Sequence, residues 1–287
     1  MIDTLDCLPC VLRQARSAAQ FAQLNREEEV ALLQSTFATL STQDFSGNPV
    51  ELFAQLCELF RKKTGDDDPY RGIRQRFNTS ILTMESQFYH QVEQAQDSFR
   101  EAVKLAVAGN IIDFAGGKEI TEALVHQRIL DVEHEGLARD DCDALVQDLN
   151  EAHTLLLLGD NCGEIVFDKV FLRYVKKRWP HLQVHYGVRG GAILNDSIRA
   201  DAEDVGIGDW AQIIDNGDRA PGTLLHRVSP EFRQVFEAAD VVMAKGQGNF
   251  ESLHDAPRKI HFLFMSKCPA VCKITGTQVG DLLCMTR

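Results

Sequence analysis

The chain has 287 residues, of which 44% are hydrophobic and 25% are charged, which suits two domains or one domain with a large insertion. Its formal net charge of -12 excludes general nucleic-acid binding through a basic face. No apolar run approaches the roughly 20 residues that span a membrane, and the first residues lack the features of a signal peptide. We therefore expect a cytoplasmic protein whose eight cysteines are mostly reduced, with neither nucleic acid nor membrane as a partner.

The first 150 residues are predicted to be helical, because their apolar residues recur at helical spacing. Asn25 and Glu28 have the spacing of a capping box, Asn48 precedes a second helix start, and Gly65 is a helix stop. The helix behind the capping box is expected to bury Val30, Leu32, Leu33 and Phe37. The other predicted helices cover residues 9–22, 49–64, 70–94, 97–108, 121–130 and 141–149.

From about residue 152 onward, short apolar runs alternate with amphipathic segments, a pattern typical of βαβ units. The predicted strands cover residues 154–158, 183–188, 212–215, 241–244 and 260–265. The predicted helices cover residues 164–177, 196–205, 230–239 and 249–253. We therefore expect a helical region over residues 1–150 and an α/β core with a mostly parallel sheet over residues 151–287.

A charged or amide side chain follows every predicted strand. The five strands lead in turn to Asp160-Asn161, to Asn195-Asp196, to Asn216, to Lys245 and to Lys267. The carboxyl ends of parallel strands meet at one edge of a sheet, and α/β proteins bind their ligands there. The sequence therefore predicts a functional site at this edge.

The residue types at this edge favour phosphate chemistry assisted by a metal. Asp160, Asn161 and Asp196 offer the oxygen ligands that Mg²⁺ or Mn²⁺ prefer. Lys245 and Lys267 supply positive charge for a phosphate, and the amides of residues 246–248 add a possible anion nest. The alternative interpretation is structural, because Asp160 and Asp196 are also suited to capping a helix or closing a turn.

Several short blocks resemble, in the same order, the metal-dependent damage-control phosphatases, long known as domain of unknown function 89. The blocks are Cys7-Leu8-Pro9-Cys10, Asp68-Pro69-Tyr70, Gly109-Asn110-Ile111-Ile112-Asp113, Gly159-Asp160-Asn161-Cys162-Gly163-Glu164, Leu194-Asn195-Asp196, Asp215-Asn216-Gly217 and Ala244-Lys245-Gly246-Gln247-Gly248-Asn249. The initial Cys-x-x-Cys block resembles the prokaryotic branch of that family. The resemblance runs nearly end to end.

The resemblance implies a Rossmann-like α/β/α core with a large N-terminal all-helical region. It implies a divalent cation (Mn²⁺, Mg²⁺, Co²⁺ or Ni²⁺) held by Asp160, Asn161 and Asp196, and hydrolysis of phosphate monoesters of sugars or damaged phosphometabolites. Lys245 is expected in the catalytic set, on the phosphate side. The expected substrate contacts are Asn110, Asp113, Asn216 and Lys267. A metal-bound water is the expected nucleophile, with Asp160 itself as the alternative.

Three other functions stay open at this point. Cys7 and Cys10 with Cys268 and Cys272 have spacings that allow a shared zinc site, and the first pair also resembles redox motifs. An S-adenosylmethionine-dependent carboxyl methyltransferase is suggested by a eukaryotic relative discussed in those terms, although no glycine-rich loop follows the first strand. A metal-binding module without catalysis is the third alternative, and the oligomeric state is undetermined.

Overall fold

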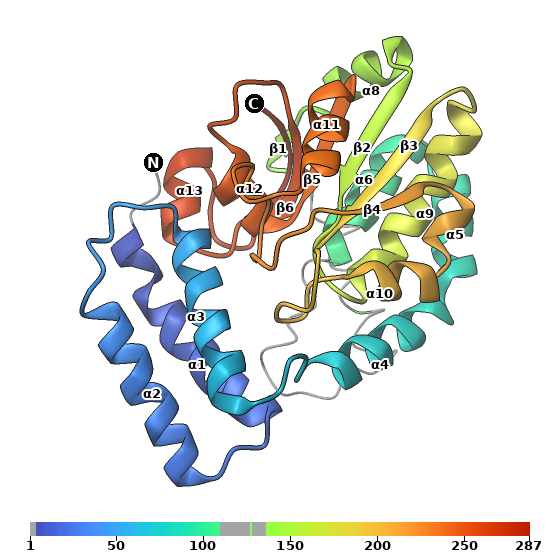
Figure 1. Cartoon of the computed structure of the whole chain (residues 1–287). Coiled ribbons are helices and arrows are strands. Elements are labelled where there is room, and N and C mark those ends of the chain that lie inside the picture. Colours follow the sequence, from blue (N-terminus) through green and yellow to red (C-terminus); the bar gives the residue numbers. More distant parts are fainter. Residues whose placement is uncertain (1–3, 110–126, 128–135) are drawn as a thin grey trace.

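The computed structural model describes residues 4–109, residue 127 and residues 136–287 (Figure 1). Its strands are β1 (Arg139–Asp140), β2 (Thr154–Leu158), β3 (Gln183–Val188), β4 (Gln212–Asp215), β5 (Val241–Lys245), β6 (His261–Met265) and β7 (Leu282–Thr286). Its α-helices are α1 (Leu8–Phe21), α2 (Arg26–Leu40), α3 (Pro49–Thr64), α4 (Arg71–Leu82), α5 (Glu85–Gln94), α6 (Ser98–Ala108), α8 (Cys142–Glu151), α9 (Glu164–Arg178), α10 (Arg199–Asp204), α11 (Pro230–Ala238), α12 (Gly246–Leu253) and α13 (Pro269–Thr275). The short 3-10 helices are Thr4–Cys7 and Ile207–Asp209.

The strands form one sheet in the order β1-β7-β6-β5-β2-β3-β4. The pairs from β6 through β5, β2 and β3 to β4 are all parallel, whereas β7 runs antiparallel to β6. The chain begins its parallel strands at β2, continues to β3 and β4 on one side, and then crosses to β5 on the other side. The reversal of strand order between β2 and β5 makes their carboxyl ends the place where such sheets form a ligand crevice.

Helices cover both faces of the sheet, which gives the predicted α/β/α core (Figure 1). Strand β2 illustrates why both faces must be covered. All its leucines are buried, and their side chains point alternately to the two faces of the sheet. Leu155 and Leu157 pack with α4, α5, α6, α8 and α9, while Leu156 and Leu158 pack with α11, α12 and α13. The helices α4 to α6 of the N-terminal region therefore share a core with the sheet.

The first three helices pack mainly on one another and lie to one side of the sheet (Figure 1). Their apolar cluster includes Val11 of α1, Leu32 of α2 and Leu56 of α3. Ile193, from the segment after β3, joins the same cluster, and the start of α3 contacts the loop around Leu224. The three-helix unit is thus attached to the loops at the carboxyl edge of the sheet.

The predicted helix ends are confirmed where their side chains act locally. Asn25 accepts hydrogen bonds from the backbone N–H groups of residues 27 and 28, and Glu28 accepts one from the Asn25 N–H, which completes the capping box. Asn48 accepts from Val50 N–H at 2.9 Å. Gly65 ends α3 in the left-handed conformation, with φ at 69°.

Three helix predictions are wrong in detail. Residues 70–94 form two helices, α4 and α5, because the two segments pack on different neighbours and the chain turns between them at Met84, which is buried. Val30 and Phe37 are exposed, because α2 contacts only one side and buries the stripe of Leu32, Thr36 and Leu40 instead. The helix predicted from residue 196 begins at Arg199, because a β-bridge between Arg189 and Ile198 keeps the preceding residues extended.

The five predicted strands are confirmed to within one residue, and β1 and β7 were missed. Strand β1 has only two residues, both exposed, so it carries no periodic pattern of its own. The predicted helix over residues 121–130 lies outside the described residues except for residue 127. Among the helices that the structure describes, none is both long enough and apolar enough to cross a membrane.

Candidate active site

Two loops meet at the carboxyl edge of β2 and bring the predicted metal ligands together. Asn161, in the turn between β2 and α9, forms an isolated β-bridge with Asp196 of the segment after β3. Ser197 N–H donates to the Asp160 carbonyl at 2.8 Å, and Cys162 N–H donates to the Asn195 carbonyl at 2.9 Å. These backbone bonds hold Asp160, Asn161 and Asp196 side by side.

The start of α12 closes on the same place from the neighbouring strand β5. A Cβ atom on Gly246 would overlap the Asp160 carboxylate, and Gly246 also has a left-handed φ of 79°. Both observations require glycine here, since only a residue without a side chain allows the backbone this close to the carboxylate. The carboxyl ends of β2 and β5 are therefore in direct contact at Asp160.

Arg189, which sequence reasoning missed as a site residue, lies between the two carboxylates. Its Nε donates to Asp196 Oδ2 at 2.7 Å, and its Nη2 lies 3.4 Å from Asp160 Oδ1. Nη1 donates to Asn249 Oδ1 at 3.0 Å and to Thr223 Oγ1 at 3.3 Å. The sequence did place Arg189 directly after a strand, but nothing local indicated that its side chain turns back across the edge.

Lys245 is enclosed beside this group, with its ammonium held by two further carboxylates. Its Nζ lies 2.6 Å from Glu164 Oε1 and 2.5 Å from Asp168 Oδ1, and all three side chains are fully buried. Burial opposes the charge of Lys245, but the facing carboxylates outweigh it and raise the pKa of the amine. The Lys245 ammonium therefore points into the core, toward Glu164 and Asp168. Its expected role in binding a phosphate stays a prediction.

The buried cluster is rich in carboxyl groups. Four acidic side chains (Asp160, Glu164, Asp168 and Asp196) and two basic ones (Arg189 and Lys245) meet in it, and none of the six residues is more than 8% exposed. Burial, followed by the charges of Asp196 and Glu164, raises the pKa of Asp160 to about 7. Burial also raises the pKa of Asp196, although Arg189 opposes that change.

This cluster fits a divalent cation. Asp160 and Asp196 are two buried carboxyl groups of the kind that Mg²⁺ and Mn²⁺ bind. The Asn161 Nδ2 donates to Asp160 Oδ2 at 2.6 Å, whereas its Oδ1 accepts from Asn195 Nδ2 at 2.9 Å, so the amide would have to rotate to offer its oxygen as the third ligand. The charge of such a cation would stabilise the ionised form of both carboxyl groups, whose pKa values burial raises. In the described part of the chain no three His, Cys, Asp or Glu residues form a ligand group by themselves, so the candidate set depends on the amide.

The other predicted substrate residues lie at different depths. Lys267 is exposed, and its charge acts to lower the pKa of both Asp160 and Asp196 against the larger effect of burial. Asn216 is buried, and its side-chain oxygen accepts from the backbone N–H groups of Gly190 and Asp218, so it ties the loops after β3 and β4 together. Asn110 and Asp113 lie outside the described residues. These four substrate contacts stay predictions.

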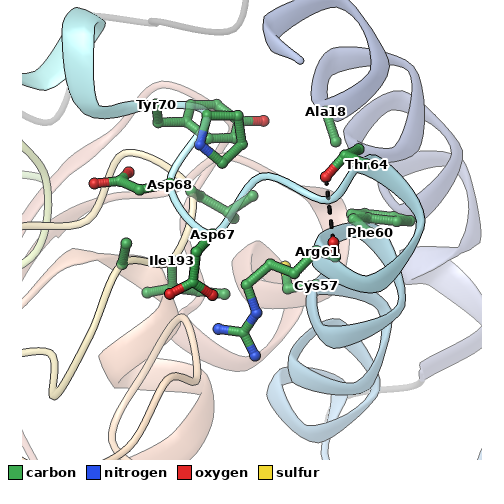
Figure 2. Close-up of a pocket in the computed structure, with 12 residues that line it drawn as sticks. Ala18, Cys57, Phe60, Arg61, Thr64, Asp67, Asp68, Tyr70 and Ile193 are labelled. Atoms are coloured by element: carbon green, nitrogen blue, oxygen red, sulfur yellow. Dashed lines mark hydrogen bonds between the residues drawn. The ribbon is translucent and has the colours of Figure 1, made fainter. Parts of the chain in front are cut away.

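A small cavity lies against the loop that carries Asp196 (Figure 2). Mostly apolar side chains from α3, from the turn before α4 and from residues 192–194 line it, among them Cys57, Phe60, Tyr70 and Ile193. Burial, followed by the charge of Asp196, raises the pKa of the Cys57 thiol to about 12, so the cavity wall lies within electrostatic reach of the predicted ligand. No motif in the sequence indicated this cavity.

One wall residue of the cavity has an unusual backbone. Leu194 adopts a φ of 47°, in the left-handed region that bulky residues rarely occupy. It directly precedes Asn195 and Asp196, and Asp196 N–H donates to the Ile193 carbonyl at 3.0 Å. Strained backbone positions of this kind concentrate at functional sites. Leu194 therefore links the wall of the cavity to the turn that carries Asp196.

The cysteines proposed for zinc are only partly gathered. Burial raises the pKa of Cys7 to about 12, and Glu251, Cys268 and Cys10 add smaller contributions, so these groups lie near one another. A thiol with a raised pKa is a weaker ligand and nucleophile, because the thiolate is the reactive form. All eight cysteines fall within the described segments, and all are free thiols.

Comparisons with known proteins place the whole chain beside one group of relatives. A family model described as the damage-control phosphatase ARMT1-like domain matches residues 4–283. An uncharacterized protein of Methanocaldococcus jannaschii is 30% identical over 295 residues, which is 98% of this chain and 94% of that protein. A damage-control phosphatase of Pyrococcus horikoshii is 31% identical over 287 residues, which is 98% of this chain and 96% of that protein. The crystal structure of a DUF89 family protein from Pyrococcus horikoshii has a TM-score of 0.88 at 27% identity and covers 99% of both chains.

Proposed function

The chain belongs to the damage-control phosphatase ARMT1-like family, and from this premise we propose that it is a divalent-metal-dependent phosphatase that hydrolyses phosphate monoesters of small metabolites. The observation that carries the proposal is that Asp160 and Asp196, both buried, lie on either side of the Arg189 guanidinium at the carboxyl edge of the sheet, where burial raises the pKa of each carboxyl. Burial disfavours the ionised form of a carboxyl, and a bound divalent cation favours it. The arrangement therefore favours a divalent cation at this edge over a purely structural role.

Asp160, Asn161 and Asp196 would hold the cation. When bound, a divalent cation polarises a phosphoryl oxygen and lowers the pKa of a water molecule. The role of Arg189 is to fix the two carboxylates, since its guanidinium contacts both and is itself fixed by Asn249 and Thr223. Glu164 and Asp168 hold Lys245 next to this group and keep the second half of the cluster rigid.

The substrate would enter from the side of Lys267. This ammonium is exposed yet acts on both predicted metal-binding carboxylates, so it is placed to attract a phosphate and to offset the charge that grows during transfer.

The test is a panel of sugar phosphates, nucleotide phosphates and an aryl phosphate against Mn²⁺, Mg²⁺, Co²⁺ and Ni²⁺. We expect no phosphate release after chelation and restored release with at least one cation. Asp160→Asn is expected to lower kcat/KM by about 1000-fold or more and to abolish cation binding measured by calorimetry.

Asp240→Asn is the matched control, because Asp240 is a carboxylate at the opposite edge of the same sheet. It is expected to retain both activity and cation binding. Full activity of Asp160→Asn, or activity that persists in chelator, would contradict the proposal. Zinc in protein purified without added metal, or micromolar binding of S-adenosylmethionine, would instead favour the alternatives drawn from the sequence.

A further inference from the structure

Helix α4 bonds to both of the segments that carry the predicted metal ligands. Arg74 and Asn78 lie four residues apart, so they share one face of the helix, and they are only 2% and 4% exposed. A buried arginine and a buried asparagine on one helix face need specific partners to offset their desolvation. Each has one partner in the α/β core, 85 or more residues further along the chain.

Asn78 holds the first segment. Its Oδ1 accepts from Gly163 N–H at 2.6 Å. Gly163 is the residue before α9, has a left-handed φ of 71° and comes two residues after Asn161. The side chain of Asn78 therefore fixes the turn through which the chain passes from the Asp160-Asn161 pair into the helix.

Arg74 holds the second segment. Its Nε donates to Asp201 Oδ2 at 2.9 Å, and the same oxygen accepts from Ile198 N–H at 3.0 Å, two residues after Asp196. The two terminal nitrogens of Arg74 form a fork on Asp68 with distances of 2.6 Å and 2.7 Å. Asp68 also lines the cavity, as Figure 2 shows, so one guanidinium joins the cavity wall to the Asp196 segment.

We propose that Arg74 and Asn78 are positioning residues that set the spacing between the Asp160-Asn161 turn and Asp196, and thereby the affinity for the cation. The inference rests on the proposed function. The two side chains act through Gly163, Asp201 and Ile198 rather than through the predicted ligands themselves. Groups that orient metal ligands from behind typically change metal affinity by about 10-fold to 100-fold when they are removed.

The test measures Mn²⁺ dissociation constants of metal-free, full-length protein by calorimetry, with kcat measured at saturating Mn²⁺. Asn78→Ala and Arg74→Lys are each expected to weaken Mn²⁺ binding by about 10-fold or more. Arg74→Lys keeps the charge but loses the fork. Because the reacting groups are unchanged, kcat at saturating Mn²⁺ is expected to stay within about 3-fold of the wild type.

Lys169→Met is the matched control. Lys169 of α9 pairs with Glu85 of α5 at 2.7 Å and is largely buried, so its loss also breaks a tertiary contact between an N-terminal helix and α9. We expect a lower melting temperature but an unchanged Mn²⁺ dissociation constant. This variant separates a positioning role from general stabilisation, and Asn78→Ala serves alone if Arg74→Lys does not fold.

The outcomes distinguish the two proposals. Tight Mn²⁺ binding by the wild type that Asn78→Ala leaves unchanged would overturn the positioning role and leave the proposed function intact. Equal losses of Mn²⁺ affinity in Asn78→Ala and Lys169→Met would also overturn the positioning role. No Mn²⁺ binding by the wild-type chain would overturn the proposed function, and the inference with it.

Discussion

Carboxyl groups at the two edges of the sheet have pKa values shifted in opposite directions. The parallel strands begin at the amino edge and end at the carboxyl edge. At the amino edge, Asp240 accepts from the backbone N–H groups of His153 and Thr154, and these bonds lower its pKa. Asp148, at the same edge, holds Lys259 and His261, which lower its pKa against the effect of its partial burial. At the carboxyl edge, burial raises the pKa of Asp160 to about 7 and also raises that of Asp196.

The difference separates acids that stabilise the fold from the acids of the candidate site. A carboxylate with a lowered pKa is stabilised as an anion by groups that the fold already supplies, so it stabilises the folded chain. A carboxylate with a raised pKa is disfavoured as an anion until a further cation arrives. The same residue type thus supports the fold at one edge and makes the other edge a candidate site.

Replacing a paired lysine at each edge should give the largest difference between the edges in the free energy of unfolding. Lys245→Met leaves Glu164 and Asp168 buried without their cation, so it should lower the free energy of unfolding by about 3–5 kcal/mol. Lys259→Met breaks an ion pair whose lysine is 53% exposed, and its effect should stay under about 1 kcal/mol. Denaturant unfolding of metal-free protein measures both, and equal losses would remove the distinction between the edges.

Glu251, on α12, offers a second test of this comparison, because its ionisation should make the free energy of unfolding depend on pH. Burial raises its pKa from 4.5 to about 7, so the folded state binds its proton more tightly than the unfolded state does. Its stabilising contribution is therefore complete below about pH 4.5 and is lost as the pH rises through about 7. Glu251→Gln should remove this loss and gain roughly 2 kcal/mol over the wild type between pH 4.5 and pH 8, a value reduced for partial exposure.

The measurement is the free energy of unfolding of both proteins across that pH range in chelator. Gln keeps an oxygen that can accept from Gln247, which donates to Glu251 at 2.7 Å in the wild type. The difference between the two curves should be flat below about pH 4.5 and should widen toward pH 8. Parallel curves would show that Glu251 does not titrate in this range and would weaken the contrast between the edges.

The smallest effect is expected at the amino edge. Asp240→Ala removes the acceptor of two backbone N–H groups, and because the site is exposed the cost should be about 1 kcal/mol near neutral pH. The pKa of Asp240 is lowered, so this contribution should be complete above about pH 4 and should be lost as the pH falls from there through its lowered folded-state pKa. Thermal unfolding measured in steps from about pH 7 down to about pH 2 tests this, and a loss on substitution that does not depend on pH would contradict the assignment.

Much of the architecture was predictable because it depends on local patterns. The leucine run of β2, the capping box at Asn25 and the left-handed Gly65 each act within a few residues, and each was located from the sequence. The edge at which charged residues collect also followed, since parallel strands place their carboxyl ends together. The exposed Val30 and Phe37 were mispredicted because burial depends on what packs against a helix, which periodicity does not specify.

The sequence by itself determined the five central strands, most of the helices between them and the edge where Asp160, Asn161 and Asp196 lie, because hydrophobic periodicity and turn residues encode these locally. Only the tertiary structure decided which charges meet. Arg189 contacts the carboxylates of Asp160 and Asp196. Lys245 points into the core and pairs with Glu164 and Asp168. Helix α4 forms hydrogen bonds with both of the segments that carry the predicted metal ligands. Such pairings depend on the packing of segments distant in sequence, where a shift of one ångström makes or breaks a hydrogen bond.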